Sequence, residues 1–139
     1  MRVAVVIPAF DEEESIVGAI ASAAAGGVEV IVADGGSLDG TRDRAEAAGA
    51  RVVRSPKGRA QQLEAGVHAS DADVLLLLHA DTRLPDGFTA AIDAFAGSDV
   101  AREALGDGFV DTFVGDRHWQ LEAFAGAVTD WELAMFSNL

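Results

Sequence analysis

Residues 74 to 82 read Val-Leu-Leu-Leu-Leu-His-Ala-Asp-Thr, and this stretch decides the fold. Its apolar run suits a strand that is buried on both faces of a parallel sheet, and it stops abruptly at polar residues. The carboxyl ends of such strands border the crevice in which α/β proteins bind their ligands. Asp81 is therefore a candidate to hold a metal or a phosphate, with a turn cap before Pro85 as the alternative.

Working outward, the rest of the chain alternates between strand and helix patterns. Apolar runs predict four strands, at residues 3–7, 28–33, 51–54 and 74–78. Helical spacing of apolar residues follows each of them, at residues 12–25, 38–48, 59–69 and 88–96. This alternation predicts an α/β fold of right-handed βαβ units with a mostly parallel sheet. A strand order of 3-2-1-4 would place the ends of the first, second and fourth strands side by side.

Local signals set the expected ends of these elements. Pro8 is expected to end the first strand. Asp11, with Glu14 three residues later, has the form of a helix N-cap followed by a capping-box acid. The pattern weakens beyond Ser98, where residues 109–114 are interpreted as a strand and residues 119–127 as a helix.

Composition restricts the classes of partner. The chain has 139 residues, half of them hydrophobic, which is typical of one globular domain. A formal net charge of -13 disfavours binding to nucleic acid or an acidic membrane through the overall field. There is no cysteine, and no stretch has the length of a signal peptide's apolar region or a membrane span. A cytosolic location is the default expectation, with peripheral association at a membrane as the alternative.

Distinctive side chains follow three of the predicted strands. They are found in Pro8-Ala9-Phe10, in Asp34-Gly35-Gly36-Ser37 and in His79-Ala80-Asp81. An exposed aromatic ring, a carboxylate for a ribose or base and a second carboxylate for a divalent cation together suit a nucleoside diphosphate. The alternatives are that Phe10 belongs to the core and that Asp34 forms an N-cap or an Asx-turn.

Three further residues are candidates near the same crevice. Arg59 stands near a predicted helix N-terminus, where guanidinium and helix dipole both favour phosphate, although it can equally be a solvated helix residue. Glu12 is the acid of its cluster nearest the crevice, and such acids also favour a helix start. His79 can ligate a metal or satisfy a local hydrogen bond, and its spacing from the other two histidines does not suit zinc.

The ordered motifs resemble the family 2 glycosyltransferases of GT-A fold. Val-Val-Ile-Pro-Ala-Phe-Asp-Glu-Glu at residues 5–13 looks like the family's opening strand and nucleotide loop. Val-Ala-Asp-Gly-Gly-Ser-Leu-Asp-Gly-Thr at 32–41 is similar to its second motif. Lys-Gly-Arg at 57–59 and Leu-His-Ala-Asp-Thr at 78–82 complete the series. His-Ala-Asp-Thr resembles a branch with a histidine where many members have the first acid of Asp-x-Asp.

The resemblance implies a role for each candidate. Pro8 and Phe10 would line the nucleobase pocket, Asp34 would contact base or ribose, Arg59 would approach the diphosphate, and Asp81 would bind Mg²⁺ or Mn²⁺. It implies transfer of a sugar from a UDP- or GDP-sugar to an unknown acceptor by an inverting displacement, which requires a general base. Asp130 is a weak candidate for that base.

The resemblance also implies a division of the chain. Residues 1–98 would bind the nucleotide-sugar, and residues 99–139 would form a divergent or incomplete acceptor-side segment, with apolar surface that favours self-association. A non-catalytic nucleotide-binding fragment or interaction module is the alternative function. The absence of Gly-x-Gly-x-x-Gly and Gly-Lys-Ser/Thr disfavours a dinucleotide dehydrogenase and a P-loop enzyme. A nucleotidyltransferase is also disfavoured, because the loop after the first strand is acidic rather than basic.

Overall fold

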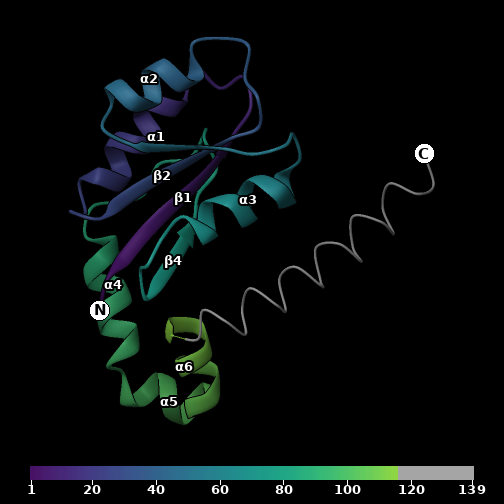
Figure 1. Cartoon of the computed structure of the whole chain (residues 1–139). Helices are drawn as coiled ribbons and strands as arrows, with labels where there is room; N and C mark the ends of the chain where they lie inside the picture. Colours follow the sequence, from purple (N-terminus) through teal and green to yellow (C-terminus); the bar gives the residue numbers. More distant parts are fainter. Residues whose placement is uncertain (116–139) are drawn as a thin grey trace.

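The computed structural model describes residues 1–115, which form a parallel sheet with helices on both faces (Figure 1). The strands are β1 (Val3–Ala9), β2 (Glu29–Asp34), β3 (Arg51–Arg54) and β4 (Val74–Leu77). The helices are α1 (Ile16–Ala24), α2 (Thr41–Ala47), α3 (Arg59–His68), α4 (Phe88–Ala96), α5 (Asp99–Leu105) and α6 (Asp107–Gly115). The predicted α/β class is confirmed.

The sheet has the order β3-β2-β1-β4, and every strand pair is parallel. Val5 lies opposite Val30 of β2, and Val6 lies opposite Leu77 of β4. The predicted order 3-2-1-4 is therefore confirmed. Because the strands are parallel and in this order, the segments that follow β1, β2 and β4 leave the same edge of the sheet next to one another.

Alternating side chains of the strands build a separate core on each face of the sheet. On one face, Val5 and Ile7 pack with buried residues of α1, α2 and α4. On the other face, Val6 and Ile31 pack with Leu63 of α3. Figure 1 shows α3 on the side of the sheet away from α1 and α2. Helix α3 therefore packs on β1, β2 and β3 on this face of the sheet.

Pro8 does not end the first strand, contrary to the prediction. β1 continues to Ala9, and Pro8 lies opposite Ala33 in the pairing with β2. The backbone groups of alternate residues point to alternate neighbours, and the carbonyl of Val6 accepts from the N–H of Leu78 on the β4 side. Pro8 therefore also faces the β4 side, one step beyond the last strand pair. Its missing N–H removes no ladder bond there, so the proline is tolerated.

The predicted capping box at Asp11 is also wrong. Asp11 has a φ of 54°, and α1 begins only at Ile16, after Ser15. The Asp11 carboxylate accepts a hydrogen bond from the Leu38 N–H at 2.8 Å instead of capping the helix. The acid is therefore used to join two loops, which a local sequence pattern cannot reveal.

Residues 109–114 lie in helix α6 and not in a strand. Asp107 and Asp111 are one helical turn apart, and both carboxylates contact the Arg102 guanidinium, at 3.3 and 2.7 Å. This pairing raises the pKa of Arg102, mainly through the hydrogen bond to Asp111. The spacing of the two acids favours a helix, and this preference outweighs the strand preference of the β-branched and aromatic residues between them. The predicted helix at 119–127, together with Asp130, lies outside the described residues.

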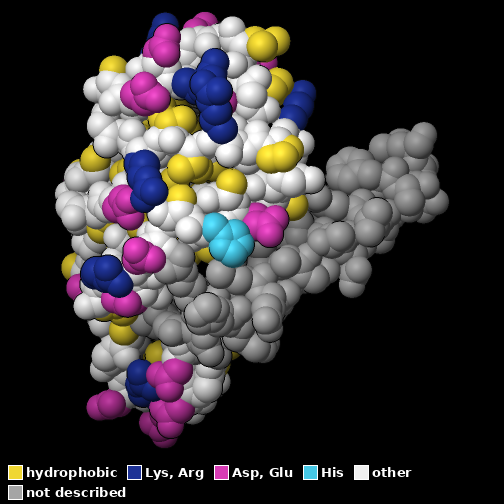
Figure 2. Space-filling view, viewed as in Figure 1, with side chains coloured by type: hydrophobic (Ala, Val, Ile, Leu, Met, Phe, Trp, Pro, Cys, Tyr) yellow, Lys and Arg dark blue, Asp and Glu magenta, His cyan; other side chains and the backbone are white. Residues whose placement is uncertain are grey.

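The surface carries both signs of charge. Figure 2 shows basic and acidic side chains interspersed over one face, with acids gathered around α5 and α6. Across residues 1–115, no helix combines the length and the apolar character needed to cross a membrane.

Candidate functional site

Phe10 leaves the carboxyl end of β1 with one ring face covered by a cation. The Lys57 ammonium lies 3.7 Å from the centroid of the ring, which is within cation–π range. Phe10 is only half-buried, which argues against the alternative interpretation that it belongs to the core. The structure therefore places an accessible aromatic face and a basic loop side by side at this edge of the sheet.

Asp34 ends β2 and is buried, with 1% of its surface exposed. Its carboxylate accepts from the N–H of Gly36 at 3.1 Å and from the N–H of Ser37 at 3.2 Å. Arg42 lies 3.7 Å away and balances the charge. The Asx-turn alternative is thus present in the structure. A contact between Asp34 and a base or ribose stays a prediction. The Asp34 carboxylate would have to make that contact while it also accepts the hydrogen bonds of its own turn.

Side chains and backbone groups join the loop after β1 to the loop after β2. The Asp11 N–H donates to Ser37 Oγ at 3.0 Å, and the Glu12 N–H donates to Thr41 Oγ1 at 2.8 Å. The Glu13 N–H donates to Asp39 at 3.2 Å. Because each bond pairs a backbone group of one loop with a side chain of the other, the two loops are held in a fixed relationship.

Two acids of these loops have defined local roles. The hydroxyl of Thr41 and backbone N–H groups hold the pKa of Asp39 below its usual range. The Glu12 carboxylate accepts from Ser15 Oγ at 2.8 Å, so it stabilises the turn before α1. A nucleotide contact by Glu12 therefore stays a prediction with a competing structural role.

Arg59 is the first residue of α3 and meets the segment that follows β4. Its Nη2 is in direct contact with Nε2 of His79. Gly58, immediately before the helix, has a φ of 145°, a conformation that side chains rarely adopt. The structure thus brings together two of the predicted site segments, and it assigns the His79 ring to a hydrogen-bonding role in the described state.

Asp81 is exposed on the same segment, and its Oδ1 accepts from Thr82 Oγ1 at 3.1 Å. The described residues contain no group of three or more acids and histidines arranged to hold a metal ion. Mg²⁺ and similar hard cations commonly use one or two carboxylates and complete their coordination with substrate phosphates and water. One exposed carboxylate fits a cation that arrives with a nucleotide, whereas a metal ion held by the protein alone would need several ligands.

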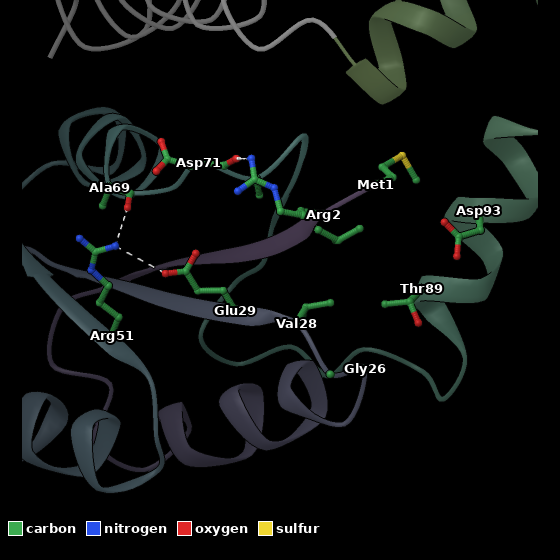
Figure 3. Close-up of a pocket in the computed structure, with 13 residues that line it drawn as sticks. Met1, Arg2, Gly26, Val28, Glu29, Arg51, Ala69, Asp71, Thr89 and Asp93 are labelled. Atoms are coloured by element: carbon green, nitrogen blue, oxygen red, sulfur yellow. Dashed lines mark hydrogen bonds and ion pairs between the residues drawn. The ribbon is translucent and has the colours of Figure 1, made fainter.

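A hollow lies at the opposite edge of the sheet, where the strands begin (Figure 3). It has a volume of about 720 Å³ and is lined by charged groups that pair with one another. Arg51 lies 3.5 Å from Glu29 and donates to the carbonyl of Ala69, while Arg2 donates to the carbonyl of Asp71. These contacts tie the amino ends of the strands together. The hollow is therefore not the crevice that the sequence predicts.

Two residues of the carboxyl edge were not singled out from the sequence. Lys57 was quoted only as part of a motif, although it covers the Phe10 ring. Gln62 is 5% exposed and donates to the carbonyls of Ala9 at 2.6 Å and Ala33 at 3.1 Å. A polar residue on the helix face that includes Leu63 and Gly66 is the sequence signal that could have identified Gln62.

Comparison with known proteins agrees with this arrangement. The family described as Glycosyl transferase family 2 matches residues 4–101, which include every strand and all described site segments. The chain belongs to this family. As a member of the family 2 glycosyltransferases, it is 36% identical over 116 residues to glycosyltransferase AglJ of Haloferax volcanii. That match covers 78% of this chain and 37% of AglJ.

Solved structures of similar sequence have the same fold. Glucosyl-3-phosphoglycerate synthase from Mycobacterium tuberculosis in complex with UDP has a TM-score of 0.58 and 30% sequence identity. The match covers 67% of this chain and 39% of that chain. The same enzyme with Mn²⁺, UDP and glucosyl-3-phosphoglycerate has a TM-score of 0.55 at 27% identity, covering 77% of this chain and 41% of that chain. The chain thus spans about two fifths of the length of these relatives.

Proposed function

We propose that this chain binds a nucleotide-sugar at the carboxyl ends of β1, β2 and β4, and that it takes part in glycosyl transfer. The contact between Arg59 and His79 is the observation that carries the proposal. It brings the arginine at the N-terminus of α3 against the segment that ends in Asp81. A phosphate group would bind at the helix N-terminus with its arginine, and a divalent cation would bind at the Asp81 carboxylate. A diphosphate with its cation therefore suits the space between Arg59 and Asp81.

The remaining candidates fit the other half of the same ligand. Phe10, which directly follows β1 and lies two residues after Pro8, offers a ring face, and Lys57 lies over that face in the described state. Asp34 adds a carboxylate beside it, with the competing loop contacts described above. A planar base followed by a ribose and a diphosphate would extend from Phe10 past Asp34 to Arg59.

The proposed reaction is a single inverting displacement. A hydroxyl oxygen of the acceptor forms a bond to the anomeric carbon of the sugar, and the bond from that carbon to the diphosphate breaks. The hydroxyl proton passes to a general base, and negative charge develops on the leaving nucleoside diphosphate. A divalent cation, when bound, would offset that charge, and Arg59 would hydrogen-bond to the same phosphates.

UDP is the nucleotide that we favour, ahead of GDP. The glucosyl-3-phosphoglycerate synthase structures contain UDP, and one contains UDP-glucose with Mn²⁺. These enzymes share the fold of this chain at 27–30% identity. Their acceptor is not transferred to this chain, because this chain spans only about two fifths of their length.

Titration calorimetry tests the proposal. The chain is titrated with UDP and with GDP, each with and without Mn²⁺, and uridine serves as a ligand without phosphate. We expect UDP to bind with Mn²⁺ and to lose about tenfold or more in affinity without it, because the cation bridges carboxylate and diphosphate. Absence of metal-dependent binding for both diphosphates would contradict the proposal.

A donor-binding module without transfer activity is the second candidate. The family match ends at residue 101, whereas the weak base candidate Asp130 lies beyond it and outside the described residues. All the described candidates serve the donor side. Acceptor-dependent release of UDP from UDP-sugars separates the two candidates, because a binding module would show binding without that release.

A further inference from the structure

Gln62 joins three segments of the carboxyl edge that otherwise belong to separate elements. It lies on α3, one turn after Arg59, and its side chain is almost fully buried at 5% exposure. Its Nε2 donates to the carbonyl of Ala9 at 2.6 Å and to the carbonyl of Ala33 at 3.1 Å. Ala9 directly precedes Phe10, and Ala33 directly precedes Asp34.

We propose that Gln62 is a positioning residue for the donor site, one that holds the loop of Phe10, the turn of Asp34 and the start of α3 in a single arrangement. The proposal rests on the proposed function. Gln62 need not touch the nucleotide, because it acts through the backbone of the residues that precede the contact residues. Both donor hydrogens of its amide nitrogen are used by strand-end carbonyls, so the side chain is fixed at two points.

The surroundings of Gln62 leave space for the amide and little else. A Cβ built on Gly35 would lie 2.9 Å from Cδ and 3.0 Å from Nε2 of Gln62, which is closer than real Cβ contacts. On the next turn of α3, a Cβ on Gly66 would lie 2.3 Å from a methyl carbon of Val6. The two glycines thus let the helix approach β1 and let the amide reach the strand ends. The Ala9 carbonyl also accepts from the Gly35 N–H at 3.0 Å, so an apolar residue at position 62 would remove one of its donors and leave both buried carbonyls with one hydrogen bond fewer, which is costly.

Gln62→Met tests the proposal, because methionine has a similar length and is apolar but has no N–H donor. We expect the Kd for UDP, measured with Mn²⁺ by titration calorimetry, to rise about tenfold. Leu63→Ala is the matched control, since Leu63 is buried on the same helix and packs on the same sheet away from the strand-end carbonyls. It should lower the Tm at least as much and leave the Kd near that of the wild type.

Gly35→Ala tests the same contact without altering Gln62, and it is available should Gln62→Met fail to fold. Gly35 is not among the described residues with positive φ, so alanine suits its backbone and acts mainly by displacing the amide. We expect it also to raise the Kd about tenfold. In a Gln62→Ala background the added methyl has room, so the two changes should be strongly non-additive.

Each outcome bears on the proposal. Wild-type affinity for UDP in Gln62→Met, an equal loss in Leu63→Ala, or additive effects of Gly35→Ala and Gln62→Ala would overturn it. Failure of the wild-type chain to bind any nucleoside diphosphate would instead count against the proposed function. Loss of affinity in Gln62→Met and Gly35→Ala, with normal binding by Leu63→Ala, would support a positioning role.

Discussion

Arg59 and His79 are in direct contact although 20 residues separate them in the sequence. The first begins helix α3, and the second follows β4 at the far end of the βαβ unit that the helix connects. Guanidinium and imidazole meet through their terminal nitrogens, and a neutral imidazole can accept from the guanidinium. A diphosphate bound here would offer Arg59 a stronger, charged acceptor than the imidazole, so nucleotide binding is expected to exchange one partner for the other.

Arg59→Ala is expected to weaken UDP binding about tenfold while changing uridine binding little. The lost interaction is a charge-assisted hydrogen bond to phosphate, which uridine does not make. Calorimetry with both ligands in the presence of Mn²⁺ measures the difference. Arg51→Ala removes the same charge at the opposite edge, where Arg51 pairs with Glu29, and should leave both affinities unchanged. An equal loss for uridine and UDP would show that Arg59 does not contact the diphosphate.

Asp81→Asn is expected to remove the dependence of UDP binding on Mn²⁺. An amide has the same shape as the carboxylate and lacks the anionic oxygen that a hard cation favours. Affinity with Mn²⁺ should fall about tenfold, to the value seen without the metal. Asp86→Asn, at an exposed carboxylate five residues later, is the control and should keep the metal effect. Mn²⁺-dependent binding by Asp81→Asn at the wild-type level would place the metal on other residues.

Asp39→Asn is expected to destabilise the chain at neutral pH and to have a smaller effect at low pH. Its hydrogen bonds to Thr41 and neighbouring N–H groups lower the pKa of Asp39 from about 3.8. A lowered pKa contributes stability above the unfolded value, and the contribution is lost as the pH falls through the folded value. Thermal melts of both proteins from pH 7 to pH 3 measure this, and the Tm difference should shrink toward pH 3. A pH-independent difference would assign the effect to packing.

The sheet could be predicted from the sequence because its strands carry strong local signals. The apolar run that begins at Val74 and the β-branched run that begins at Val3 are each typical of a strand in a parallel sheet. The order 3-2-1-4 is the usual arrangement of a doubly wound sheet, with the switch point between the first and fourth strands. The site segments were found for the same reason, since each directly follows a strand.

The errors arose where contacts between distant residues override a local pattern. Asp11 and Glu14 have the spacing of a capping box, but the Asp11 carboxylate accepts a hydrogen bond from the Leu38 N–H instead. Residues 109–114 are rich in the β-branched and aromatic residues that favour a strand, but Arg102 pairs with Asp107 and Asp111 on one helical face. Gln62 has no motif of its own, because its role depends on two carbonyls in other elements.

Donor binding and sugar transfer make different demands on the described residues. Transfer requires a base within hydrogen-bond reach of the acceptor hydroxyl. The carboxylates of the carboxyl edge have other partners: Asp34 holds its turn, Asp11 accepts from Leu38, and Glu12 accepts from Ser15. Asp81 is reserved for the cation in the proposed site. None of these four is therefore free to act as the base.

We accordingly expect UDP-glucose to be bound but turned over slowly, by water, with a rate that added acceptors do not raise. A steady-state assay of UDP release with mixed sugar and phosphoglycerate acceptors measures this, and a catalytically competent family 2 enzyme is the positive control. Brisk acceptor-dependent release would contradict the expectation and would point to a base other than these four carboxylates. Asp130→Asn would then be the first variant to compare, with Glu132→Gln as its matched control, because loss of turnover in the former alone would identify the base.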